Sequence, residues 1–228
     1  MKHSGKARNA AFKMILITLC LILLVPIIGF LGMAIGSAMV AVSFFLLLVW
    51  FIFALFTLYF FRDPTAKVPA GSGLVVSPGH GKVDVIDTVN EVQFMGRECQ
   101  RISMFLSVLN VHVQNAPVSG RVAYVKHTEG QFLNAMKTEC ASCNENVYIG
   151  FEANDPRDEK IGMKLIAGVL ARRIVPFVTT GDEMARGDRI SLIQFGSRVD
   201  VYLPQSARIK VKLGDRVVGG ETVLAAFE

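Results

Sequence analysis

The longest stretch of this chain without a charged residue runs from Met14 to Phe61, and it constrains the fold more than any other feature. A single helix through all of it would be roughly 70 Å long, more than twice the roughly 30 Å hydrocarbon core of a bilayer. Small residues that can turn the chain lie near its middle, at Gly29, Gly32, Gly36 and Ser37. We therefore expect two membrane spans, near Met14–Phe30 and Met39–Phe61.

Basic residues flank this stretch on both sides, and the expected turn between the spans carries no charge. The flanking cations are Lys2, Lys6, Arg8 and Lys13 before the first span, and Arg62 and Lys67 after the second. The positive-inside rule then places both ends in the cytoplasm. We predict a transmembrane hairpin anchor over residues 1–62 and a cytoplasmic domain over 63–228, at the inner face of the cell membrane. A signal peptide is too short to explain the run, and a single span with a buried second helix would place the domain outside.

The rest of the chain alternates short apolar runs with turn residues, which is typical of β-structure. We expect a mostly β (α+β) domain with few helices, of which Gly130–Met136 and Val169–Ile174 are the candidates. The predicted strands are Leu74–Val76, Lys82–Val89, Arg101–Leu106, Gly120–Lys126, Val147–Glu152, Lys164–Ala167, Ile190–Phe195, Arg198–Tyr202 and Thr222–Phe227.

The C-terminal segment Val211–Ala225 places Gly214-Asp215 and Gly219-Gly220-Glu221 between apolar pairs. Such turns are typical of small β-sandwich modules, and the segment resembles the second half of a biotinyl or lipoyl barrel-sandwich. No lysine stands in an attachment motif there. The prediction is therefore a barrel-sandwich-like tail that carries no cofactor of its own.

Cysteine usage and net charge exclude some classes of function. Cys140 and Cys143 form one CxxC, but no second pair of ligands follows in the sequence, so we predict no metal site. The alternative is that Cys99 and His127 converge on the CxxC and supply the missing ligands. The net charge of +5 is modest, and the basic residues are scattered without interleaved aromatics. Nucleic acid is therefore not an expected partner, whereas an anionic membrane surface is.

The segment Leu192–Pro204, with the sequence LIQFGSRVDVYLP, sets a Gly-Ser pair between two strand-like runs. Glycine tolerates dihedral angles that other residues avoid, and a serine hydroxyl can attack the carbonyl that precedes it. The Gly196–Ser197 junction can therefore rearrange to an ester, although most Gly-Ser pairs between strands are only turns.

Six segments in order give the junction a context. They are FFRDP at Phe60–Pro64, VVSPGHGKV at Val75–Val83, FLSVLNVHVQNAPVSGRV at Phe105–Val122, NENV at Asn144–Val147, IAGVLARRIV at Ile166–Val175 and GDRISLIQFGSRVDVYLP at Gly187–Pro204. Together they resemble the short-form phosphatidylserine decarboxylases, a pyruvoyl-dependent family.

The resemblance implies that the chain cuts itself between Gly196 and Ser197, so that Ser197 becomes a pyruvoyl group at the start of a new small chain. The carbonyl of that cofactor would form a Schiff base with the amine of phosphatidylserine and take up the electrons released with CO2. His112, in the segment NVHV, matches the histidine motif of the family and is our candidate acid. The expected partners are the lipid substrate, the membrane and the two chains of one precursor; a homo-oligomer stays open.

This chain departs from the family pattern at two positions. His80 stands where the family usually has the aspartate of SPADG, and Asn115 stands where longer members have a second histidine. His80 is the alternative base for cleavage, because the unperturbed pKa of histidine is about 6.5. Asn115 and the adjacent Arg172 and Arg173, which can grip a phosphate or carboxylate, are the candidate substrate-binding residues.

Two classes of function remain open from the sequence. The first is an enzyme, a carboxy-lyase that makes phosphatidylethanolamine at the membrane. The second is an unprocessed, membrane-tethered β-sandwich that binds anionic lipid or a protein partner, with the Gly196–Ser197 bond intact.

Overall fold

A computed structural model describes residues 5–31, 36–133, 143–155, 157–168, 173–194 and 197–227. The chain divides into two compact units, Gly5–Asp63 and the part that begins at Pro64. Some residues named above lie outside the described residues: Lys2, Gly32, Met136, Cys140, Val169, Arg172, Phe195 and Gly196.

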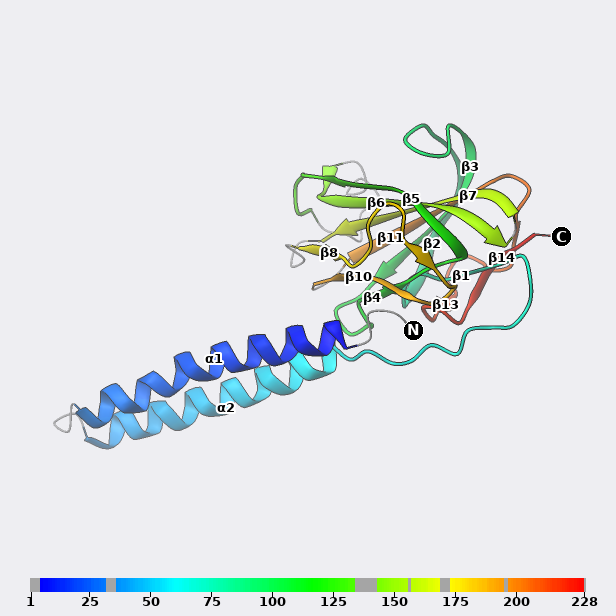
Figure 1. The fold of residues 1–228 in the computed structure, drawn as a ribbon. Coiled ribbons are helices and arrows are strands. Elements are labelled where there is room, and N and C mark those ends of the chain that lie inside the picture. The colour runs from blue at the N-terminus through cyan, green and yellow to red at the C-terminus, as the bar shows by residue number, and fades with distance from the viewer. Residues whose placement is uncertain are drawn as a thin grey trace. The chain divides into compact units, whose positions relative to one another are not determined.

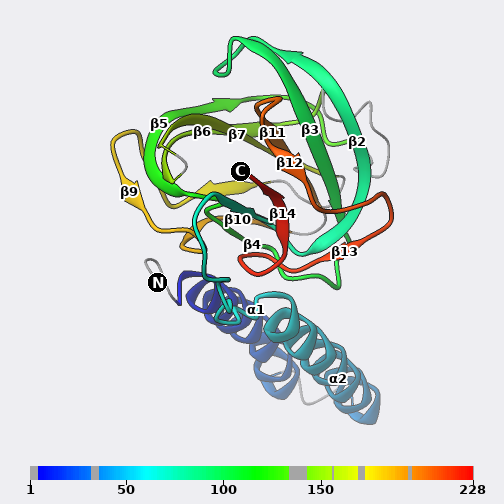
Figure 2. The same ribbon diagram turned by 90° about the vertical axis from the view of Figure 1, so that its right-hand side faces the viewer.

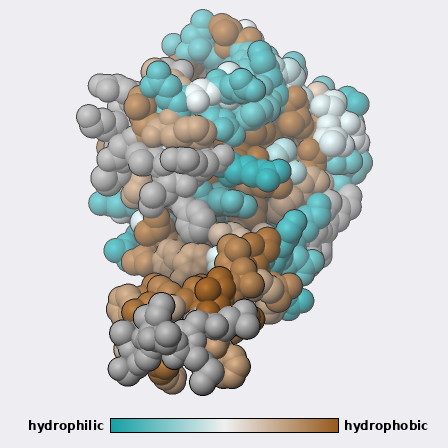
Figure 3. Space-filling view, turned by 90° about the vertical axis from the view of Figure 1, so that its left-hand side faces the viewer, coloured by the Kyte–Doolittle hydropathy of each residue, from teal (hydrophilic) through white to brown (hydrophobic). Residues whose placement is uncertain are grey.

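The first unit is a pair of helices, α1 (Lys6–Leu31) and α2 (Gly36–Phe60), as Figure 1 shows. Each is long and apolar enough to cross a membrane, and brown apolar side chains cover them in Figure 3. The Trp50 indole Nε1 donates to Thr18 Oγ1 at 3.1 Å and joins the two helices. The two predicted helices are confirmed, but α1 begins eight residues before Met14. Its first turns therefore include cations that precede the apolar stretch.

The turn between the spans is shorter than we predicted. Gly29 lies within α1, while Gly36 and Ser37 begin α2, so glycine and serine in this stretch are helical rather than turn residues. Residues 32–35, between the two helices, lie outside the described residues.

The second unit is built around one antiparallel sheet of eight strands, confirming the mostly β prediction. Figure 2 shows this sheet curling from β5 through β7 and β11 to β2. In spatial order its strands are β13 (Arg216–Val217), β2 (Gly81–Glu91), β3 (Arg97–Leu106), β11 (Ser197–Leu203), β7 (Arg157–Ala167), β6 (Asn146–Asp155), β5 (Ser119–Thr128) and β9 (Glu183–Met184).

Two sheets of three strands lie on the concave side of the large sheet. One contains β1 (Leu74–Val76), β14 (Val223–Ala226) and β12 (Arg208–Ile209); the other contains β4 (Val113–Asn115), β10 (Arg189–Ile193) and β8 (Ile174–Pro176). The segment after Ser197 thus contributes β11 to β14, and these strands pair with β1, β2, β3 and β7 of the preceding chain.

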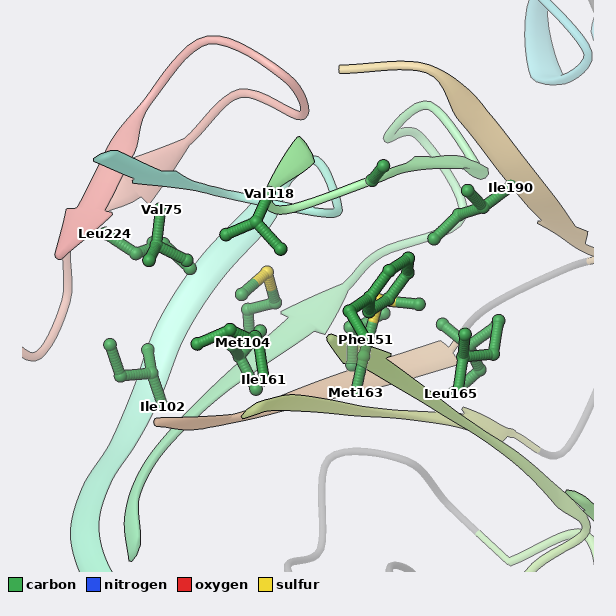
Figure 4. Close-up of a cluster of buried hydrophobic side chains, with 14 of the residues drawn as sticks. Val75, Ile102, Met104, Val118, Phe151, Ile161, Met163, Leu165, Ile190 and Leu224 are labelled. Atoms are coloured by element: carbon green, nitrogen blue, oxygen red, sulfur yellow. The ribbon is translucent and has the colours of Figure 1, made fainter. Parts of the chain in front are cut away.

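The hydrophobic core fills the space between the large sheet and the two small ones. In Figure 4, Val75 and Ile190 of the small sheets face Met104, Phe151 and Leu165 of the large sheet, and all five are fully buried. Burying a side chain of this size contributes about 1.5–3 kcal/mol, so this layer holds the three sheets together.

All nine predicted strands are confirmed, with ends that differ by up to seven residues. The helix predicted over Val169–Ile174 is wrong at its described end, because Arg173 is not helical and Ile174 begins β8. Residues 169–172, and residues 134–136 of the other predicted helix, lie outside the described residues. Gln131 forms a bridge with Asn144 instead of a helical turn. The alternative in which Cys99 and His127 converge is not borne out, because β11, β7 and β6 separate β3, which holds Cys99, from β5, which holds His127.

Candidate active site

Ser197 is the first residue of β11, and its position in the sheet is fixed by partners on both sides. It pairs with Leu106 of β3 and with Ala167 of β7. Side chains alternate along a strand, so Ser197 faces the core together with Val199 and Val201. The Ser197 hydroxyl is therefore held inside the domain at one end of a central strand.

The Ser197 side chain is fully buried, and within the described residues its Oγ has no hydrogen-bond partner. A buried hydroxyl without a partner costs about 1–3 kcal/mol, so such groups are rare and call for an explanation. A nucleophile that must be free to attack a neighbouring carbonyl gives that explanation. The orphaned hydroxyl fits the precursor of a pyruvoyl group.

His112 lies between β3 and β4 and is fully buried. Its Nδ1 lies 2.9 Å from the carbonyl oxygen of Asn110. A carbonyl can only accept, so Nδ1 carries the proton and Nε2 carries the lone pair of the neutral ring. The His112 carbonyl also accepts a hydrogen bond from the amide of Ile193 at 3.1 Å. This bond holds the backbone of His112 at the end of β10, where Ile193 lies four residues before Ser197 in the sequence.

His80 and Asn115, far apart in the sequence, meet at Gly219. A Cβ on Gly219 would lie 2.9 Å from Asn115 Oδ1 and 3.1 Å from His80 Nε2, so only glycine leaves both side chains in place. Asn115 Nδ2 donates to the carbonyl of Gly187 at 2.8 Å, which leaves its Oδ1 directed at this space. The two positions at which the chain departs from the family pattern are thus neighbours in space.

The loop that carries His80 packs close to the partner of Ser197. A Cβ on Gly79 would lie 3.4 Å from the side chain of Leu106, which is paired with Ser197 in the sheet. The amide of Asn115 donates to the carbonyl of Pro78 in the same loop at 2.8 Å. The SPGHG segment therefore connects the Asn115 side of the site to the start of β11.

Arg173 is exposed, and its carbonyl accepts from the Gln194 amide at 3.2 Å. Its backbone is thus tied to the segment that leads to Ser197, while its side chain is open to solvent. Arg172 and Gly196 lie outside the described residues. The structure therefore brings His80 and Asn115 together, and it ties the backbones of His112 and Arg173 to the segment that leads to Ser197.

Sequence reasoning missed a charged cluster on the other face of the same sheet. Arg198 is 1% exposed and binds Asp84 of β2 through two contacts, Nη1 to Oδ1 at 3.0 Å and Nη2 to Oδ2 at 2.5 Å. Asp200 is fully buried two residues further on. The signal available in the sequence was a charged residue at every second position of a central strand, in SRVDV.

Burial raises the pKa of the Asp200 carboxyl above its usual range. The hydroxyl of Ser103, which lies opposite Asp200 in the register, acts against this rise, as do the nearby cations. These cations are Arg101, Arg198 and Lys164. The cluster is thus an electrostatic network that spans β3, β11 and β7.

Metal ligands do not gather in the part of the chain that the structure describes: no group of three His, Cys, Asp or Glu side chains lies close enough to hold an ion there. His127 Nε2 instead lies 3.1 Å from Glu145 Oε1, and the Cys99 thiol lies 3.3 Å from the Arg97 carbonyl oxygen.

A β-rich domain with an orphaned buried serine at the start of a central strand, preceded by two apolar helices, has close relatives. The sequence profile of the phosphatidylserine decarboxylase family matches residues 53–225. A phosphatidylserine decarboxylase proenzyme of Desulfotalea psychrophila is 40% identical over 200 residues, covering 86% of this chain and 92% of the relative. Proenzymes of Symbiobacterium thermophilum and Ruegeria pomeroyi are 42% and 44% identical, over 75% of this chain and 79% and 78% of their own lengths.

The chain therefore belongs to the phosphatidylserine decarboxylase family. Membership confirms the resemblance noted in the sequence and makes the chain an enzyme of the carboxy-lyase class. Its relatives are named as proenzymes, which implies that they are processed after synthesis.

Proposed function

We propose that this chain decarboxylates phosphatidylserine to phosphatidylethanolamine, using a pyruvoyl group made from its own Ser197. The observation that carries the proposal is the buried Ser197 hydroxyl without a hydrogen-bond partner within the described residues. It stands in the segment that matches the family motif, and the named relatives are proenzymes. A pyruvoyl group supplies an electrophilic carbonyl that captures the substrate amine and accepts the electrons released with CO2.

The self-cleavage would begin with attack of Ser197 Oγ on the carbonyl carbon of Gly196. An ester bond forms, and the peptide C–N bond between the two residues breaks. Elimination across Cα and Cβ of residue 197 then releases the Gly196 carboxylate and leaves a dehydroalanine. Water hydrolyses this group, so that its nitrogen leaves as ammonia and the ketone of the pyruvoyl group remains. Residues 1–196 become the large chain and residues 197–228 the small chain.

Two histidines would handle the protons of these reactions. His80, beside Asn115, is the proposed base that activates the Ser197 hydroxyl. Asn115 Oδ1 faces the same space as the His80 ring and would orient it. Because Nδ1 of His112 donates to the Asn110 carbonyl, Nε2 would take up a proton and then deliver it to the substrate carbon after CO2 has left.

Arg172 and Arg173 would bind the anionic groups of the substrate, since a guanidinium can grip a phosphate or carboxylate through two parallel bonds. Residues 1–62 would anchor the enzyme, and residues 63–228 would form the catalytic domain on the cytoplasmic side of the inner membrane. Cations on both sides of the apolar hairpin support this orientation.

Intact-mass analysis of the purified full chain tests the proposal. We expect two polypeptides separated between Gly196 and Ser197, with a carbonyl on the small one that reacts with hydrazine. Ser197→Ala is the matched control, and it should remain a single chain without that carbonyl and without decarboxylase activity. A continuous wild-type chain lacking a reactive carbonyl would contradict the proposal.

Two further variants separate the roles of the histidines. His80→Ala should abolish cleavage if His80 is the base, and normal cleavage in that variant would remove it from the mechanism. His112→Gln should still cut itself but decarboxylate about 10²–10⁴-fold more slowly, the usual contribution of a positioned acid. Normal turnover by His112→Gln would assign the proton to another group.

A further inference from the structure

The first side chain after Ser197 is unusually well held for the end of a strand. Arg198 turns to the face opposite Ser197 and is almost completely buried. Its guanidinium meets the Asp84 carboxylate through two parallel contacts of 3.0 and 2.5 Å. Such a bidentate pair fixes the direction of the side chain as well as its position.

Alternation along β2 places Asp84 on this face, because it follows Val83, whose side chain lies in the core. A β-bulge then interrupts the strand: Val83 pairs with Met104 and Val85 with Ser103, so the register skips Asp84. In a regular strand Asp84 and Asp87, three residues apart, would point to opposite faces. The bulge brings Asp87 to the same face as Asp84, and bulges are common next to active sites.

The Arg198–Asp84 pair connects two strands that are not neighbours. β11 and β2 are separated by β3, so the contact reaches across a whole strand. Once the chain is cut before Ser197, this contact would join the small chain to the large one. Strand ends normally fray, whereas a two-point contact one residue from the end, with the Arg198 side chain buried and the Asp84 side chain 29% exposed, opposes fraying.

We propose that the Arg198–Asp84 ion pair positions residue 197, both for self-cleavage and as the first residue of the small chain. This inference rests on the proposed function. Ser197 and Arg198 are adjacent and point to opposite faces, so fixing the Arg198 side chain fixes the rotation of the strand and the direction in which residue 197 points. Both residues of the pair are positioning residues and touch no reacting atom.

The same sheet face provides a matched control. Arg101 of β3 binds Asp87 of β2 through contacts of 2.9 and 2.6 Å, and both residues precede the cleavage site. This second pair holds β2 to its direct neighbour and does not reach the end of β11. Loss of the second pair should lower stability without moving residue 197.

The test compares Arg198→Gln, Arg198→Lys and Arg101→Gln in the full chain purified in detergent. Three quantities are measured: the rate of self-cleavage by denaturing electrophoresis, the carbonyl content by hydrazine labelling, and the decarboxylation rate per carbonyl group. Arg198→Gln should slow cleavage and turnover per carbonyl about a hundredfold, the loss expected for a misplacement of about 1 Å. Arg198→Lys keeps the positive charge but cannot make two parallel contacts, so its rates should lie between those of Arg198→Gln and the wild type.

Arg101→Gln should cleave and turn over within about twofold of wild type. The proposal is overturned if both Arg198 variants behave like wild type, or if Arg101→Gln is slowed as much as Arg198→Gln, which would make the effect a general loss of stability. If the wild-type chain itself is uncut and carries no carbonyl, the proposed function fails as well. If the wild-type chain cleaves normally and the Arg198 variants are unaffected, only the positioning role of the Arg198–Asp84 ion pair is rejected and the proposed function stands.

Discussion

The two faces of β11 carry opposite kinds of side chain and are both buried. The inner face presents Val199, Val201 and Leu203 to the continuous apolar core. The outer face presents Arg198 and Asp200, which are buried as completely in a network of ions. An acidic residue is accepted on the outer face although burial opposes its charge, because Arg101, Arg198 and Lys164 offset part of that cost.

The largest effect should come from moving a carboxylate to the inner face. Val201→Asp places a charge among apolar side chains, and an unpaired buried charge costs at least about 3–5 kcal/mol, a large part of the stability of a typical domain. Thermal unfolding in detergent should find no cooperative transition in this variant. Val201→Ala, the control, should lose about 2 kcal/mol and still unfold cooperatively.

A smaller effect is expected where the outer face is closely packed. A Cβ on Gly162 would overlap the Tyr148 hydroxyl, and Tyr148 stacks on Tyr202 with ring centroids 5.8 Å apart. Gly162→Ala should lower the free energy of unfolding by about 1–3 kcal/mol. Tyr148→Phe removes the overlapping oxygen, so adding it to Gly162→Ala should restore part of the loss. A double variant no better than Gly162→Ala would contradict this packing.

Asp200→Asn should change how stability depends on pH. Burial raises the pKa of the folded Asp200 carboxyl, so its contribution to stability is complete below the unfolded pKa of about 3.9 and is lost as pH rises through the folded value. The variant lacks this dependence. The Tm of Asp200→Asn should therefore rise relative to the Tm of the wild type between pH 4 and pH 8. A difference in Tm that stays constant over this range would contradict the prediction.

The smallest effect should come from an ion pair outside both faces. Arg121 and Glu152 meet at 2.6 Å, but their side chains are 52% and 43% exposed. Exposed pairs contribute little, because water and salt screen them. Arg121→Gln should leave Tm unchanged at low and high salt. A clear drop would show that exposure is a poor guide to the worth of ion pairs in this sheet.

The sequence predicted the long strands because each has an apolar run bounded by turn residues. It missed β4, β8, β9, β12 and β13, which have only two or three residues and therefore no measurable period. It placed the turn of the hairpin too broadly, because glycine was taken as a breaker where the apolar surroundings keep Gly29 and Gly36 helical.

The sequence named Ser197 and His112 as candidates because residue type and motif agree there; the structure buries both side chains, and their catalytic roles stay predictions. The nearness of His80 to Asn115 was not, because it depends on Gly219 from the end of the chain leaving room between them. The Arg198–Asp84 pair was missed for a similar reason. The pair forms only because β3 lies between β2 and β11, a strand order that no local sequence pattern encodes.

The interlaced order of the strands has a consequence for a chain cut before Ser197. The last four strands belong to two different sheets, and three of them, β11, β13 and β14, pair with strands from the first part of the chain. Such a molecule is a naturally split protein, whose fragments share one fold as the halves of an engineered reporter do. Neither fragment could leave without dismantling the other, so exchange of labelled fragments between molecules would be as slow as global unfolding.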